Sequence, residues 1–206
     1  MAIPVCVTGY IKRGGKTMKK VLGVVVAMMC LVSIAGAGMI VPRVGLDFAG
    51  NHEMEQGSYS EDYDTKMGFS LGAEYLSPAT DKFLLGGGFK YNLNRKIDGY
   101  DAAFGFSPLY VTGMYVMKSS AQTIWPYAKV NLGYNILFTG NDDYKGPASL
   151  KGGLYYGAGI GAIIQKNIFV DLMYSSYAGQ MEFAGTQVDV TDTHFGMTVG
   201  YAFDLK

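Results

Sequence analysis

The stretch that decides the fold runs from Lys129 to Ile136 and reads KVNLGYNI. Large apolar residues occupy its second, fourth, sixth and eighth positions, and Lys, Asn or Gly occupies each position between them. Successive side chains of a β-strand point to opposite faces, so this alternation predicts a strand with one bulky apolar face and one slim, small or polar face. A helix would instead repeat its apolar positions every three or four residues.

The same alternation returns in eight stretches between Met39 and the end of the chain. An eight-stranded barrel has an interior just wide enough to be filled by side chains. The bulky faces together carry about thirty large groups, which cannot all enter such an interior. They must face outward, where lipid is the solvent that accepts so much apolar surface. The sequence therefore predicts an all-β fold, an eight-stranded antiparallel up-and-down transmembrane β-barrel over residues 38–206. A soluble lipocalin-like carrier is the other all-β option, and it needs the bulky face turned inward.

The connections between the predicted strands alternate in length. The odd-numbered ones are long and polar, and we expect them to be loops over 49–66, 94–102, 139–151 and 179–191. The even-numbered ones are short, over 77–82, 118–123 and 165–167. Long outside loops and short periplasmic turns are typical of outer-membrane barrels. In the second long loop, Asp98-Gly99 is the pair that favours a hairpin tip.

The N-terminal residues read as an export signal. Met18-Lys19-Lys20 precedes an uncharged apolar run over 21–34, and small residues follow at Ala35-Gly36-Ala37. This order predicts a signal peptide over 18–37, cleaved near Ala37. Residues 1–17 are interpreted as a misannotated upstream extension, with Met18 as the true start. The alternative is a membrane-spanning helix, because the apolar run extends through Val41 to about the 20 residues that a bilayer requires.

Charge and cysteine usage exclude several classes of function. None of the seventeen Asp and Glu precedes Asp47, whereas five of the seventeen Lys and Arg fall in the first twenty residues, so residues 38–206 carry twelve cations against seventeen anions. Such a body repels nucleic acid. Both cysteines, Cys6 and Cys30, fall in the first thirty residues, so the rest of the chain has no thiol for redox chemistry or metal binding. No cofactor is expected.

Two short pieces support a resemblance to a known family. Residues 153–159 read GLYYGAG and residues 169–174 read FVDLMY, within the eight-strand pattern. In these features the chain resembles the outer-membrane β-barrel domain family that includes the OmpA barrel and OmpX. The resemblance implies a place in the bacterial outer membrane, contact with its lipid and lipopolysaccharide, and delivery by the barrel-insertion machinery. It implies a structural or surface-interaction role, in which the long loops could bind an extracellular ligand.

The slim face carries the first group of candidate site residues. Its inward charges are Arg43, Asp47, Glu74, Lys90, Lys129 and Asp171. Buried charges need partners, and strand positions predict that Arg43 approaches Glu74 and that Lys129 lies at the height of Asp171. These residues could form a static polar plug or a gate for small solutes, as in a narrow porin-like channel. The narrow interior favours the plug.

Tyrosines form a second candidate group on the bulky face. We interpret them as an aromatic girdle at the membrane interface, where Tyr is enriched. They fall near the ends of the predicted strands, at Tyr75, Tyr91, Tyr134, Tyr156, Tyr174 and Tyr201.

The two histidines raise the alternative of a lipid-modifying enzyme. His52 neighbours Glu53 and Glu55, and His194 neighbours Asp192, but no Ser or Thr stands at a recognisable triad spacing. Both histidines are therefore predicted to be solvated loop and rim residues, and the protein to be non-enzymatic.

Acidic residues crowd the first and third long connections. They are Glu53, Glu55, Glu61, Asp62 and Asp64, with Asn141-Asp142-Asp143 in the third. Oxygen clusters of this kind hold Ca²⁺ or Mg²⁺ when the spacing is right, but no complete calcium loop is present. Solvated acidic loops are the favoured interpretation, and Met54, Tyr59 and Tyr63 could make the first of them a contact surface.

Overall fold

The computed structural model describes residues 38–57, 59–93, 95–96, 103–118, 123–139, 148–183 and 186–205. The predicted signal peptide over 18–37, the predicted extension over 1–17 and the Asp98-Gly99 tip lie outside these residues. In the described part, no helix has the length and apolar character of a membrane span. The regular elements there are all β-strands.

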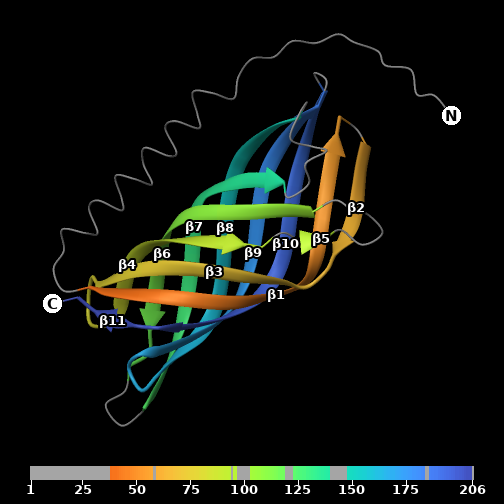
Figure 1. Ribbon diagram of the computed structural model, residues 1–206. Coiled ribbons are helices and arrows are strands. Elements are labelled where there is room, and N and C mark those ends of the chain that lie inside the picture. The colour runs from red at the N-terminus through yellow and green to blue at the C-terminus, as the bar shows by residue number, and fades with distance from the viewer. Residues whose placement is uncertain are drawn as a thin grey trace.

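Eight long strands pair in a closed ring (Figure 1). Each pairs antiparallel with its neighbour along the chain, and β10 pairs with β1 from Arg43 to Glu55, which closes the ring. This confirms the prediction of an all-β, antiparallel, up-and-down sheet with eight strands in its ring. The eight are β1 (Met39–Gln56), β3 (Gly68–Pro78), β4 (Phe83–Asn92), β6 (Ala103–Val116), β7 (Ile124–Thr139), β8 (Ala148–Ile164), β9 (Ile168–Phe183) and β10 (Thr186–Tyr201).

Three short strands extend this ring. β2 (Tyr59–Thr65) pairs with the far half of β1 and continues the line of β3. β5 (Arg95–Lys96) pairs with the start of β6, and β11 (Phe203–Asp204) pairs with the start of β1.

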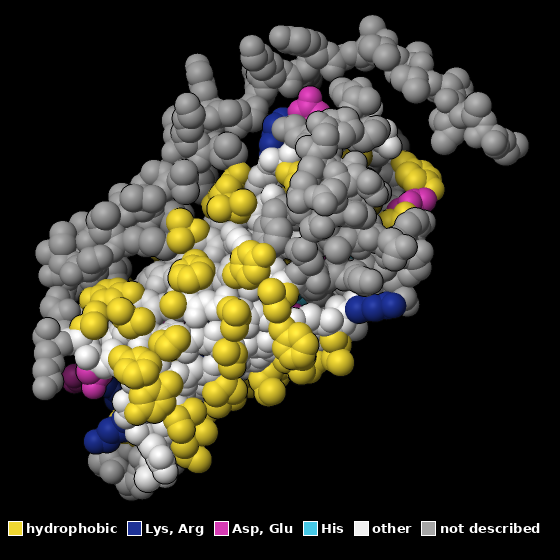
Figure 2. Space-filling view, viewed as in Figure 1, with side chains coloured by type: hydrophobic (Ala, Val, Ile, Leu, Met, Phe, Trp, Pro, Cys, Tyr) yellow, Lys and Arg dark blue, Asp and Glu magenta, His cyan; other side chains and the backbone are white. Residues whose placement is uncertain are grey.

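The two faces of the strands are separated as the alternation predicts. On β7, the bulky residues Val130, Leu132 and Ile136 are 54 to 60% exposed, whereas Lys129, Asn131 and Asn135 are at most 7% exposed. The same division holds on the other strands, and Figure 2 shows hydrophobic side chains spread over the outer surface of the ring. The bulky face therefore points outward and the slim face lines the interior.

Two of the four predicted long loops, 49–66 and 179–191, are mostly strand, which corrects the sequence-based boundaries. β1 and β2 form a hairpin through most of 49–66, and β9 and β10 run through 179–191 apart from residues 184–185. β8 begins at Ala148, inside the third predicted loop, and β5 lies inside the second.

Polar cross-strand pairs explain why these loop-like sequences form strands. Side-chain bonds join Asn51 to Asp62, Ser60 to Glu53, and Gln180 to Asp189 across the hairpins. Pairs of this kind stabilise strands without an apolar face. In these stretches, polar composition therefore indicates strands with solvated faces. It does not indicate that strand pairing ends there.

The opposite end of the ring carries the short turns. Residues 165–167 connect β8 to β9, with Gln165 and Lys166 at φ of 51° and 71°. Between β3 and β4, the Thr80 hydroxyl accepts hydrogen bonds from the backbone N–H groups of Lys82 and Phe83. The predicted short connections over 77–82 and 165–167 are confirmed, whereas most of 118–123 lies outside the described residues.

Apolar side chains fill both ends of the interior, which the prediction of a small or polar inner face missed. One layer closes the short-turn end, and another lies toward the hairpin end. The first comprises Val41, Leu76, Leu84, Met114, Val116, Tyr127, Ile163, Phe169 and Ala202. The second comprises Phe106, Tyr110, Leu137, Tyr155, Tyr177 and Val190. The central polar groups of the interior lie between these two layers, whereas His52 and His194 contact Phe106 and Tyr177 of the second layer.

Candidate functional site

The candidate site is the set of polar side chains inside the ring. All six inward charges expected from the sequence are there, contributed by five different strands. Arg43, Asp47, Glu74, Lys129 and Asp171 are buried, and the side chain of Lys90 is 14% exposed. The strand register carries each of them to the inner face, because each falls between two outward residues.

Four of these charges form what we call the central cluster, made of Arg43, Glu74, Lys129 and Asp171. Arg43 Nε lies 2.8 Å from Glu74 Oε2, and Arg43 Nη1 donates to Asp171. Lys129 Nζ lies 2.5 Å from Glu74 Oε1 and 3.7 Å from Asp171 Oδ2. Each cation thus contacts both carboxylates, and two positive charges balance two negative ones. Buried charges persist only with such pairing.

Hydroxyl groups complete the central cluster. Tyr110 donates to Glu74 at 2.9 Å, and Thr198 donates to Asp171 at 2.8 Å. The Tyr127 hydroxyl also donates to Asp171. A Cβ at Gly161 would overlap the Tyr127 ring, so this glycine makes room for the tyrosine. The carboxylates therefore receive hydrogen bonds in addition to their ion pairs.

A second group, the upper cluster, runs from the centre of the ring toward the hairpins. It consists of Lys90, Asp47, His194, Asp192 and His52. Lys90 Nζ lies 2.8 Å from Asp47 Oδ1, and His194 Nε2 lies 3.4 Å from the same oxygen. His194 Nδ1 faces Asp192 Oδ2 at 3.1 Å, and Asp192 Oδ1 lies 3.9 Å from His52 Nδ1.

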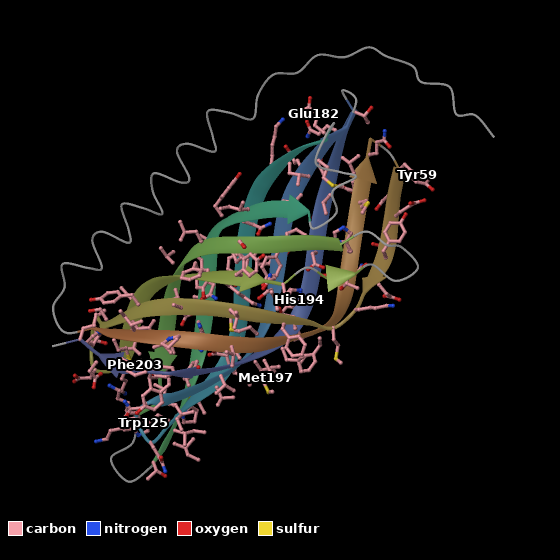
Figure 3. The ribbon with its side chains drawn as sticks, in the orientation of Figure 1. Tyr59, Trp125, Glu182, His194, Met197 and Phe203 are labelled. Carbon is pink, nitrogen blue, oxygen red and sulfur yellow. The ribbon has the colours of Figure 1, made fainter. Side chains whose placement is uncertain are left out.

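The two histidines correct the sequence-based interpretation. His52 and His194 are 1% and 2% exposed, so they are interior residues and not solvated loop or rim residues (Figure 3). Tyr177 stacks on His194 with ring centroids 5.1 Å apart. The sequence did contain a pattern that indicates the interior position of His194, because Asp192 and His194 continue the inward alternation of Gly196 and Thr198. The last strand was expected to begin only just before His194, at the rim, whereas β10 begins at Thr186.

Very little space remains between these side chains. One cavity of about 30 Å³ lies in the centre of the ring, lined by the central cluster and by Lys90, Tyr110 and Tyr155. Its volume is about the share of one or two water molecules. This packing makes the interior a filled core, which is the geometry expected of a plug.

The six candidate girdle tyrosines lie on the outer face, as predicted. Tyr75, Tyr91 and Tyr201 lie near strand ends, but Tyr156 and Tyr174 lie near the middle of β8 and β9. This corrects their expected placement, and the cause is the extension of both strands into the hairpins. Whether the six form an interfacial girdle stays a prediction.

The acidic residues of the first hairpin engage neighbouring side chains. Hydrogen bonds donated by the hydroxyls of Tyr59 and Tyr63 lower the pKa of Glu61. Glu53 and Asp62 accept bonds across the hairpin. Among the described residues, no three His, Cys, Asp or Glu side chains are placed to hold a metal ion. Residues 141–143 lie outside the described ranges.

Three solved structures of outer-membrane proteins resemble this chain. OprG from Pseudomonas aeruginosa matches with a TM-score of 0.55 and 12% identity, over 83% of this chain and 96% of OprG. AlkL matches with a TM-score of 0.47 and 11% identity, over 100% of this chain and 97% of AlkL. Neisserial surface protein A matches with a TM-score of 0.45 and 13% identity, over 80% and 98%.

The likeness to OprG defines the fold and leaves the role open. The match to OprG shows that the two chains share a fold, and the identity is too low to carry more. No protein-family model matches the chain, and no curated protein sequence matches it. The finer resemblance to the OmpA barrel and OmpX stays a prediction.

Proposed function

We propose that this chain is an integral β-barrel protein of the bacterial outer membrane, with a structural or surface-interaction role. The observation that carries the proposal is the exposed apolar surface of the closed ring. Outward residues on all eight strands are large and apolar, and many are about half exposed, as Phe69 and Ile160 are at 64% and 65%. A soluble monomer rarely exposes a contiguous apolar patch beyond a few hundred Å².

Ring closure supports the same environment. In lipid, every backbone polar group must be satisfied within the protein, and a closed sheet achieves this. The soluble-carrier alternative needs an open interior lined by the bulky face. The interior is instead filled by the two clusters and the two apolar layers, so the outer face has only lipid to cover it.

The hairpin end is the proposed surface-interaction region. Tyr59 is 64% exposed at its tip, and Glu55, Glu61 and Asp62 are exposed around it (Figure 3). Long elements on a rigid scaffold are where binding concentrates. We propose outer-membrane lipid and lipopolysaccharide as the surroundings, the barrel-insertion machinery as the delivery route, and an extracellular ligand for the hairpins. Replacing residues 50–66 with a short Asn-Gly turn should abolish adhesion to that ligand, and unchanged adhesion would reject this role.

We propose further that the barrel is plugged and non-enzymatic. The packed centre leaves room for about one or two waters, which favours the plug over the narrow channel. In planar bilayers the protein should show no discrete openings, and Glu74→Ala should introduce none. Openings altered by Glu74→Ala would support a gate instead.

Cell fractionation followed by gel electrophoresis tests the proposal. The mature chain should start near Gly38, reside in outer-membrane vesicles and migrate faster unheated than boiled, because a folded barrel resists detergent. Recovery of the folded protein in a soluble fraction would reject the proposal.

A further inference from the structure

A groove of about 570 Å³ lies on the outer face of the ring. It follows β1 along Pro42–Val44, with Leu71 of β3 on one side. Val199 and Tyr201 of β10 and Ile168 of β9 line the other side. Its volume falls in the range of about 300–1,000 Å³ that small-molecule sites occupy. Phe203 and Met197, labelled in Figure 3, are exposed on β11 and β10 toward its two ends.

The strand register explains why a hollow forms here. The outward row through Pro42 continues to Ala73 on β3 and then to Phe89 on β4. On the other side, Tyr201 pairs with Ile168. Two small side chains thus stand side by side between a phenylalanine and a tyrosine. The groove itself is low over Pro42 on β1 and is flanked by Leu71 on β3 and by Tyr201 on β10.

The backbone at the groove floor is also unusual. β10 pairs with β1 up to Arg43↔Gly200, and β11 resumes the pairing at Ile40↔Phe203. Between them, the N–H of Ala202 donates to the carbonyl of Asn167, and the Asn167 side chain donates to the carbonyl of Ala202. Pro42 has no N–H to offer the ladder. These bonds fix the turn at 165–167 to the chain next to Tyr201, and Tyr201 and Ile168 both line the groove.

That turn supplies a positive charge next to an apolar channel. Lys166 is exposed, with φ of 71°, and it lies two residues before Ile168, which lines the groove. An apolar groove with a lysine two residues along the chain from its wall matches an acyl chain that carries a phosphate headgroup. Lipid on the short-turn side of the membrane presents that combination.

We infer that this groove binds one acyl chain of a phospholipid, with its phosphate at Lys166. The inference rests on the proposed membrane location. It adds a defined lipid site to a surface that otherwise contacts lipid at random. The low wall over Pro42 admits the chain, and the flanking Leu71 and Tyr201 confine it.

Native mass spectrometry of the protein extracted from outer membranes in mild detergent tests this site. The wild-type barrel should retain one phospholipid as an adduct. Val44→Trp fills the groove and should lower the adduct fraction at least fivefold. Val130→Trp is the matched control, because Val130 is outward and 60% exposed, as Val44 is at 59%, but lies on β7 away from the groove. This control should keep the adduct.

Several outcomes would overturn the site. They are a wild-type protein without adduct, equal loss in both tryptophan variants, or a dimer mass that only Val44→Trp abolishes, which would make a second copy the occupant. Lys166→Gln should also lower retention relative to Lys82→Gln at the β3–β4 turn, and equal retention would remove the headgroup from the inference. Each variant is first shown to be folded in the outer membrane by its heat-dependent gel shift. A barrel that passes this check but holds no lipid refutes the groove and leaves the proposed function standing.

Discussion

The two charge clusters of the interior differ in how their charges balance. In the central cluster, Arg43 and Lys129 face Glu74 and Asp171, so the permanent charges sum to zero. The upper cluster has one permanent cation, Lys90, and two carboxylates, and its other members are histidines. The central cluster is complete without any histidine, whereas the upper cluster depends on two of them. The central cluster, which joins strands that are distant in the chain, therefore contributes more to the stability of the ring.

The largest effect is expected in the central cluster. Glu74→Gln leaves Arg43 and Lys129 with a single carboxylate, and breaking a buried pair in this way costs about 3–5 kcal/mol. Unfolding in urea, followed by loss of the fast-migrating band, measures the change.

A double variant checks that the loss comes from the broken pair. Glu74→Gln combined with Lys129→Met restores charge balance, so its loss should be smaller than the sum of the two single losses. Simple additivity would show that the two side chains are not coupled and would contradict the account of the cluster.

A smaller effect is expected in the upper cluster. Asp47→Asn weakens the bonds to Lys90 and His194, and hydrogen bonds to charged groups contribute about 1.5–3 kcal/mol. Lys90 is partly exposed and also contacts the Tyr177 hydroxyl at 3.2 Å, which limits the loss. If Asp47→Asn destabilised the barrel more than Glu74→Gln in the same urea series, the ranking of the two clusters would be wrong.

The ion pair between Lys151 and Glu182 is exposed to solvent and can be compared with the buried ion pairs of the interior. Its atoms lie 2.9 Å apart, as close as those of the interior pairs, but both side chains are nearly half exposed. Exposed pairs of this kind contribute about 0–1 kcal/mol. Lys151→Gln should therefore shift the urea midpoint very little, and a loss comparable to that of Glu74→Gln would show that burial does not set these energies.

The smallest effect concerns the titration of Glu61. Tyr59→Phe removes the main hydrogen bond that lowers its pKa, so that pKa should rise toward its ordinary value. The stability that this bond contributes is present above the ordinary pKa and is lost as the pH falls through the lowered one. Carboxyl NMR titration measures the shift, with Asp189→Asn as a control that leaves Glu61 unchanged. An unchanged Glu61 titration in Tyr59→Phe would contradict the assigned cause.

The ring and its two faces could be predicted from the sequence because strand alternation is local. The period of two in KVNLGYNI assigns each side chain to a face, and the volume of the interior then decides which face is outside. Arg43 and Glu74 lie on neighbouring strands, and their positions along these strands predicted the contact between them. These inferences need only the chain direction and the order of the strands.

The upper cluster and the hairpins could not be predicted in the same way. His52 lies in polar sequence that is typical of a loop, and His194 follows directly after the predicted loop over 179–191. Only the cross-strand bonds of the hairpins show that β1 and β10 continue through these stretches. The apolar layers at both ends of the interior were missed because Val41, Leu76 and Phe169 look like ordinary strand residues. Their inward direction depends on where each strand begins.

Spin labels on the outer face test the central claim most directly. The mature chain should lack cysteine, so single labels at Ile160→Cys, Leu172→Cys and Val130→Cys report their surroundings in native vesicles. The account predicts high accessibility to oxygen dissolved in lipid and low accessibility to a water-soluble nickel chelate at all three positions. Labels that the chelate reaches freely in a folded protein would contradict a lipid-facing surface.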